Sequence, residues 1–185
     1  MKPFIRITIL VLLISSCTPS LSNVPPTQIE YQDFGYYLTW SPDDKLLSVT
    51  ANTGLYVYDA TTFKQVAAFA EFSGSTVAFA GEYMAAINGN SVQVWNLKDY
   101  SLLFQERTTD PIQFQSVSIS PDGKWLITGE QKQFRVWELP GGNVVEKFPI
   151  DGFVSNLAFT DHNTLIVIEQ YKAVIQEWDL QDPKM

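Results

Sequence analysis

The sequence predicts an all-β protein built from about four copies of one four-stranded unit, and two repeating markers carry this prediction. Four hydrophobic runs end in an aromatic residue, in steps of 37, 42 and 41 residues, at Tyr58, Trp95, Trp137 and Trp178. A second marker steps by 39, 40 and 40 residues, at Trp40, Phe79, Ile119 and Phe159. Two markers on one period of about 40 residues, with Trp-Asp among the endings, indicate the stacked antiparallel blades of a β-propeller.

The third copy shows the expected strand order of one blade most clearly. Residues 116–120 alternate small polar and apolar side chains, as a half-buried strand does. The sequence Ser120-Pro121-Asp122-Gly123 then places Pro and Gly where a type I turn favours them. Further strands are expected at 125–128, 134–138 and 144–148, so the copy has the four short strands of one blade.

The other copies repeat this order with substitutions in the turns. The first has Ser41-Pro42-Asp43-Asp44 at the same turn, whereas the second has Ala80-Gly81-Glu82 there. The fourth has its turn at 160–163 and reaches the tail 181–185 before a fourth strand. Residues 29–31 align with the fourth strands of the other copies, so we expect them to pair with the strand ending at Trp178 and to protect its open edge.

The endings Val94-Trp95-Asn96-Leu97, Val136-Trp137-Glu138-Leu139 and Glu177-Trp178-Asp179-Leu180, together with the Ser-Pro-Asp-Gly turn, resemble the WD40-repeat family of β-propellers. The resemblance covers residues 29–180. It implies a rigid platform for protein assembly, with most members having about seven blades. No copy has the Gly-His pair of the family, so the histidine-centred network that braces many such blades is not expected. Glu177 replaces a valine that the other copies place in a strand, which predicts a looser or open fourth blade.

Four blades are few for this family, and three architectures remain open at this point. The chain can form a small closed ring, half of an eight-bladed dimer, or a partial propeller. Each is compatible with four repeats, because repeat count alone does not say what lies beside the first and last blades.

Composition and charge exclude some classes of function. The net charge is −8, and removal of residues 1–16 takes away two basic residues and no acidic ones, leaving −10. Such a surface repels phosphate backbones, so nucleic-acid binding lacks its main driving force. Anionic headgroups are repelled in the same way, so membrane attachment requires another means.

The N-terminal residues supply a means of attachment. Residues 1–6 are short and basic, 7–14 are almost all apolar, and Ser15 and Ser16 precede the single cysteine, Cys17. The apolar run is too short for a permanent membrane span and indicates a cleaved signal at 1–16. The sequence around Cys17 resembles the lipobox of bacterial lipoproteins, which implies lipidation of Cys17 and stable anchoring by two or more acyl chains.

Residues 17–28 are rich in Ser and Pro, and we expect them to tether the folded part to the membrane. Thr18 is not the aspartate associated with inner-membrane retention. The expected location is therefore the cell envelope, on the outer membrane of a diderm host or the outer face of the plasma membrane of a monoderm one.

Two sets of residues are candidates for binding, and both precede the first strands of blades. The first set is aromatic and forms either a hydrophobic lid on the blade junctions or a partner-binding patch. The residues expected to contact a partner are Phe34, Phe72 and Phe153. The second set is acidic and comprises Asp33, Asp110 and Asp151. These residues either reflect the common occurrence of Asp in such loops or bind a cation near the propeller axis.

The sequence contains no catalytic grouping that we recognise, and neither a cofactor nor a metal site is predicted. His162 is the only histidine and lies in an expected turn, and no phosphate-binding loop or nucleophile elbow is present. The sequence thus favours a lipid-anchored, non-enzymatic scaffold for an unidentified protein partner, with a homodimer as one arrangement. The alternative is a propeller that binds a cation or small ligand, or acts as an enzyme, through its acidic loops.

Overall fold

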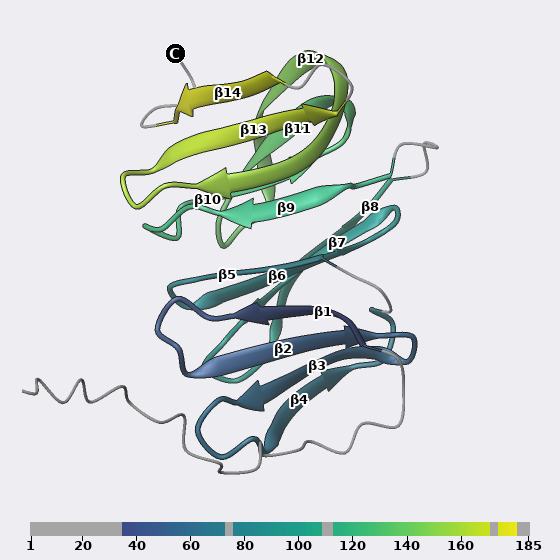
Figure 1. The fold of residues 1–185 in the computed structure, drawn as a ribbon, viewed down its shortest axis with the longest axis vertical. Coiled ribbons are helices and arrows are strands. Elements are labelled where there is room, and N and C mark those ends of the chain that lie inside the picture. The colour runs from purple at the N-terminus through teal and green to yellow at the C-terminus, as the bar shows by residue number, and fades with distance from the viewer. Residues whose placement is uncertain (1–34, 73–75, 109–112, 171–173, 181–185) are drawn as a thin grey trace, which may run out of the picture. The chain divides into compact units, whose positions relative to one another are not determined.

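A computed structural model describes residues 35–72, 76–108, 113–170 and 174–180, all of which belong to one compact unit, Tyr31–Met185. Every regular element in these ranges is a β-strand (Figure 1). No helix suited in length and apolar character to crossing a bilayer occurs in them. The closing strand expected at 29–31 lies outside the described residues.

The strands form three antiparallel sheets. The first blade is the sheet of β1 (Gly35–Trp40), β2 (Leu46–Ala51), β3 (Gly54–Asp59) and β4 (Gln65–Phe69). The second is the sheet of β5 (Thr76–Ala80), β6 (Tyr83–Asn88), β7 (Ser91–Asn96) and β8 (Leu102–Arg107). The third sheet joins β9 (Ser116–Ile119), β10 (Trp125–Gly129), β11 (Gln131–Glu138), β12 (Asn143–Phe159), β13 (Thr164–Gln170) and β14 (Val174–Asp179). The four-stranded repeat predicted from the markers is confirmed.

The third and fourth blades share strand β12, which the sequence did not predict. The pairing of β12 with β11 runs from Asn143 to Phe153, and its pairing with β13 runs from Phe153 to Phe159. Register shifts within both pairings allow the chain to pass from one blade to the next without leaving the sheet. Asp151 and Phe153, expected in a loop, therefore lie in a strand.

A bulge recurs beside the aromatic marker of the first three blades. The pairing of third and fourth strands shifts between Val57 and Tyr58, between Val94 and Trp95, and between Val136 and Trp137. A bulge increases local twist. Its repetition indicates that the three copies share backbone geometry as well as sequence.

Each blade has two distinct faces, which pack in a regular order. We call the face that carries the aromatic marker of the third strand the marker face, and the other the opposite face. The marker face of the second blade, with Trp95 and Met84, packs on Leu55 and Val57 of the first. The same arrangement joins the second blade to the third and the third to the fourth, through Trp137 and Trp178 respectively.

No core cluster of the described residues joins the first blade to the fourth. The structure is therefore a partial propeller, and the small closed ring is not what it shows. Glu177 is exposed, whereas its equivalents Val57, Val94 and Val136 are fully buried. The prediction that the fourth blade is open on this side is confirmed.

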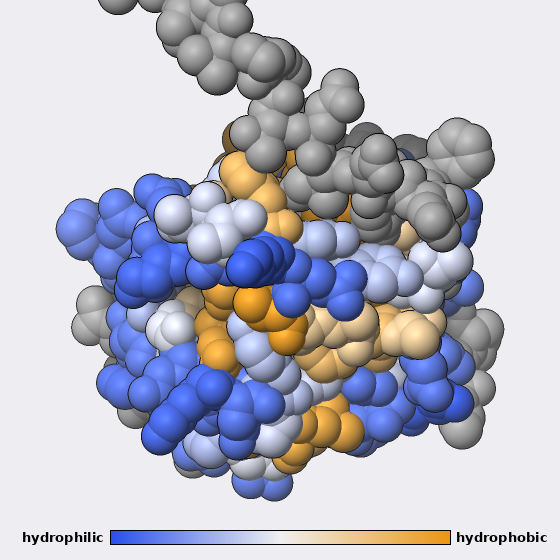
Figure 2. Space-filling model, turned by 90° about the horizontal axis from the view of Figure 1, so that it is seen from below, coloured by the Kyte–Doolittle hydropathy of each residue, from blue (hydrophilic) through white to orange (hydrophobic). Residues whose placement is uncertain are grey.

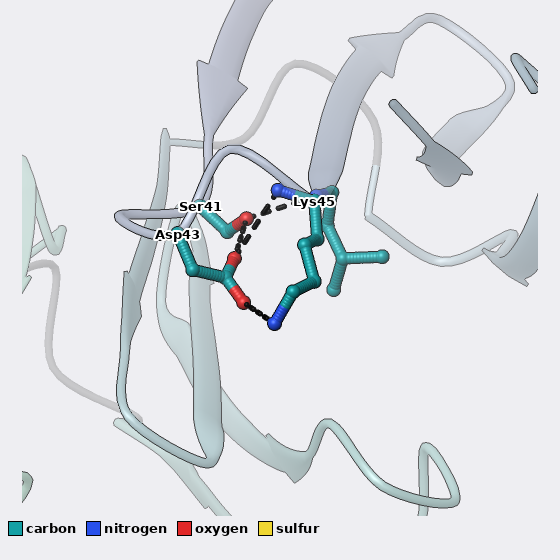
Figure 3. A network of polar contacts seen from close by, with 4 residues as sticks. Ser41, Asp43 and Lys45 are labelled. Atoms are coloured by element: carbon teal, nitrogen blue, oxygen red, sulfur yellow. Dashed lines mark hydrogen bonds and ion pairs between the residues drawn. The ribbon is translucent and has the colours of Figure 1, made fainter. Parts of the chain in front are cut away.

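The Ser-Pro-Asp turns of the first and third blades are held by the same polar contacts, and Figure 3 shows those of the first blade. In the first blade, Ser41 Oγ donates to Asp43 Oδ1 (2.7 Å) and accepts from the Leu46 amide (2.9 Å), while Lys45 Nζ lies 2.9 Å from Asp43 Oδ2. Ser120, Asp122 and Lys124 repeat these contacts in the third blade. The residue that follows the aspartate has a left-handed backbone conformation in both turns, at Asp44 and at Gly123. Glycine adopts this conformation without strain.

Candidate functional site

Four of the predicted site residues cannot be placed in this structure. Cys17, Asp33, Phe34 and Asp110 lie outside the described residues. Their predicted roles in lipidation, partner binding and cation binding therefore stay predictions.

Phe72 is not a surface contact, because it is 2% exposed. Its ring packs edge-on against Trp95 at a centroid distance of 5.2 Å, within the core between the first two blades. For this residue the structure corrects the partner-binding interpretation in favour of the hydrophobic lid. Phe153 is half-buried in β12, so it remains a candidate contact.

The acidic candidate that can be placed, Asp151, is exposed on β12. Among the described residues, no group of three His, Cys, Asp or Glu side chains could hold a metal ion. His162 is exposed in the turn between β12 and β13, where its backbone amide donates to Thr160 Oγ1. These positions do not form a cation site by themselves.

A buried carboxylate is bound at the same place in the third and fourth blades, at the end of the second strand. Glu130 is fully buried and forms an ion pair with Arg135, whose Nε lies 2.6 Å from Glu130 Oε1. Arg135 lies over the rings of Phe114 and Trp137, at 5.9 and 5.8 Å from their centroids. In the fourth blade Gln176 Nε2 donates to Glu169 Oε1 (2.6 Å). A polar side chain two residues before the marker thus binds the carboxylate in both blades.

The corresponding place in the second blade borders a polar cavity of about 490 Å³. Its wall includes Asn88 and Ser91 of the β6–β7 hairpin, Gln93 of β7 and Arg107 of β8, with Glu71 and Phe72 beyond the end of β4. The volume lies within the range of small-molecule sites. The sequence analysis missed this cavity; the available signal was a glutamine, Gln93, between the two valines of a buried strand.

Two apolar faces at the ends of the blade series are also exposed. On the marker face of the first blade, Leu38 and Trp40 are 67% and 50% exposed, whereas the equivalent Val77 and Phe79 of the second blade are 6% and 8% exposed. Figure 2, which looks at the end where the first sheet lies, shows hydrophobic side chains reaching the surface between hydrophilic ones. Leu47 and Tyr58 on the same face are buried, so the exposure is concentrated on β1.

The opposite face of the fourth blade mirrors this exposure. Ile175 is 71% exposed and Ile168, its cross-strand partner, 37%. The equivalents of Ile175 in the other blades are completely buried, namely Leu55, Val92 and Phe134. The chain therefore carries, at its two end blades, both halves of the kind of contact that joins its inner blades.

Comparison with known proteins places the fold. No model of a known protein family matches the sequence, and no curated protein matches it. Among solved structures, the chain is similar to the crystal structure of the RRP9 WD40 repeats, with a TM-score of 0.70 and 14% sequence identity. The match covers 82% of this chain and 50% of that one, so the chain spans half the length of its structural neighbour. The fold is that of WD40-type propeller blades, present as a partial propeller.

Proposed function

We propose that the chain is a lipid-anchored protein of the cell envelope whose WD40-type blades act as a non-enzymatic protein-interaction module. One observation carries the interaction module: Leu38, Trp40 and Ile175 are exposed where the inner blades bury their equivalents. Burying a large apolar side chain contributes about 1.5–3 kcal/mol, and exposed apolar faces of this kind mark interaction sites. A protein partner that covers these faces gains that energy.

The inner blades indicate what shape and chemistry such a partner presents. Within the chain, every buried marker face packs on the opposite face of a preceding blade. The marker face of the first blade therefore fits the opposite face of another blade, and the fourth blade supplies such a face with Ile168 and Ile175. A second copy of the chain carries both halves, so two copies arranged head to tail satisfy both end faces and form an eight-bladed assembly.

The head-to-tail contact is heterologous, because it joins two different faces of the chain. A heterologous contact of this type closes a ring when its rotation allows. The alternative is that blades of a different protein cover these end faces. The mass of the assembly distinguishes a second copy of the chain from a different protein.

The mass of residues 18–185 in solution, measured by light scattering after size exclusion, tests whether two copies of the chain associate. We expect a discrete dimer, and we expect Trp40→Glu or Ile175→Glu to convert it to a monomer because each places a charge in the contact. Leu102→Glu is the matched control, since Leu102 is also 50% exposed but lies on β8, outside both end faces. A wild-type monomer, or equal disruption by Leu102→Glu, would reject the paired assembly.

Attachment to the membrane is proposed through Cys17, whose context resembles a lipobox. Labelling of the full chain with a radioactive fatty acid in a bacterial host is expected to tag the wild type and to be abolished by Cys17→Ser. Persisting label on the serine variant would show that the acyl chain is elsewhere. Absence of label from both the wild type and the serine variant would reject lipid anchoring.

A further inference from the structure

The side chain of Gln93 is the starting point, because it is buried beside the cavity yet makes no hydrogen bond in the part of the chain that the structure describes. Gln93 is 8% exposed and lines the cavity of the second blade. Buried side-chain amides are nearly always hydrogen-bonded, since they have two donor hydrogens and a carbonyl acceptor. The Gln93 amide is not among the buried side-chain atoms that lack a partner, so it is open to the cavity, where water or a ligand satisfies it.

The third and fourth blades show what the position of Gln93 ordinarily binds. Its equivalents, two residues before the aromatic marker, are Arg135 and Gln176, and both bind a buried carboxylate. Those carboxylates belong to Glu130 and Glu169, each four residues after the leucine that pairs with the marker, Leu126 or Leu165. The chain thus contains a glutamine–carboxylate contact of 2.6 Å at the same place in another blade.

The second blade lacks this internal carboxylate. The residue four positions after Met84, the partner of Trp95, is Asn88. Its Nδ2 donates to the Glu71 carbonyl oxygen (2.7 Å) and so is directed away from the role of Glu130 and Glu169. The cavity of about 490 Å³ lies beside Asn88 and Gln93.

We infer that this cavity binds a carboxylate group from outside the chain, in the place that Glu130 and Glu169 occupy in the later blades. The Gln93 amide and the Arg107 guanidinium, both in the wall, supply the donors, and hydrogen bonds from a guanidinium to a carboxylate are among the strong ones. Glu71 is the acidic residue in the wall and is exposed, so it lies where water screens its repulsion. The carboxylate can belong to a peptide or to a small organic acid.

Calorimetric titration of the 185-residue chain tests the inference, with three probes that separate these sources. N-acetyl-glutamate methylamide presents an acidic side chain, N-acetyl-glutamine methylamide is its neutral isostere, and acetate is a free small carboxylate. We expect the glutamate probe to bind saturably and at least about tenfold more tightly than the glutamine probe, because only the former accepts charge-assisted bonds. Acetate that binds as tightly as the glutamate probe assigns the site to small acids; weaker acetate binding assigns it to peptides. Equal binding of the glutamate and glutamine probes overturns the inference.

Two variants locate the binding in the cavity. Asn88→Glu supplies the missing internal carboxylate and is expected to abolish binding of the glutamate probe without lowering the melting temperature. Gln93→Ala removes the amide and is expected to weaken binding about tenfold. Gln131→Ala, an exposed glutamine on β11, is the matched control and is expected to bind as the wild type does.

Folding of each variant is checked by a cooperative melt followed by circular dichroism. If Asn88→Glu fails to fold, Gln93→Ala and Gln93→Glu decide the matter, the latter by repelling the ligand. Unchanged affinity in folded Gln93 variants overturns the inference. The paired assembly is a separate proposal, because the cavity residues lie on neither end face; its mass is expected to be the same with and without the probes.

Discussion

At the scale of single residues, the Ser-Pro-Asp turns couple a local sequence motif to charge. Three donors from Ser41 and Lys45 surround the Asp43 carboxylate. The hydrogen bond from the Lys45 side chain, followed by that from Ser41, lowers the Asp43 pKa from 3.8 to about 2. In the third blade partial burial acts to raise the pKa of Asp122, but the hydrogen bonds from Ser120 and Lys124 outweigh it and lower the pKa. Ionised aspartates thus help to hold both turns.

These lowered pKa values predict a specific dependence of stability on pH. A carboxyl group whose pKa is lower in the folded state stabilises the fold above its unfolded pKa, and this contribution is lost as pH falls through the folded value. We expect Asp43→Asn to lower the melting temperature near neutral pH, with a difference from wild type that shrinks as pH falls from about 4 to about 2. Melting curves across this range measure the effect. Asp44→Asn, with the same change of charge in the same turn, is the control; an equal effect there would mean that net charge, rather than the turn, is responsible.

At the scale of elements, the hairpin between β10 and β11 depends on a buried ion pair. Glu130 is fully buried and the Arg135 side chain is 11% exposed. Gln133 Nε2 also donates to Glu130 Oε2 (2.6 Å), so the hairpin encloses its carboxylate with bonds from both sides. Breaking one member of such a pair leaves an uncompensated charge in a medium of low dielectric constant.

We therefore expect Arg135→Leu to destabilise the protein by about 3–5 kcal/mol, as measured by urea unfolding. The double variant Glu130→Leu/Arg135→Leu is expected to recover most of this loss, since an apolar pair of similar volume removes the unpaired charge. A double variant that is less stable than the single one would show that packing over Phe114 and Trp137, rather than charge pairing, dominates the contribution of Arg135.

The sequence predicted elements well where the signal was a period or a turn. The strand markers Tyr58, Trp95 and Trp137 are buried at the ends of third strands, and Trp178 packs in the core that joins the third and fourth blades. Continuity of β12 was missed because Pro149 and Gly152 suggest a break, whereas the structure absorbs them in register shifts.

The candidate site was predicted less well than the fold. Phe72 was chosen by its place in a loop, but burial depends on the neighbouring blade, whose Trp95 covers it. Equally, a period of about 40 residues aligns Gln93 with Arg135 and Gln176, yet only pairing across strands shows that Glu130 and Glu169 lie beside the latter two. Contacts between residues distant in sequence were needed in both cases.

At the scale of the whole molecule, the regular order of blade contacts is the basis of the proposed function. Three successive interfaces are of one kind, each joining a marker face to an opposite face. The first blade exposes Leu38 and Trp40 on one half of such an interface, and the fourth exposes Ile168 and Ile175 on the other. The account predicts that a second copy joins these halves head to tail.

Intermolecular disulfide formation tests this claim most directly, because the chain has Cys17 as its only cysteine. The fragment of residues 18–185 lacks Cys17 and so contains no cysteine. One sample of it carries Leu38→Cys and another Ile168→Cys, and the two are mixed and oxidised. We expect a disulfide-linked dimer in the mixture and little in either sample alone, because the contact joins different faces. Failure of the mixture to cross-link, or equal cross-linking of Leu38→Cys alone, would contradict the head-to-tail pairing.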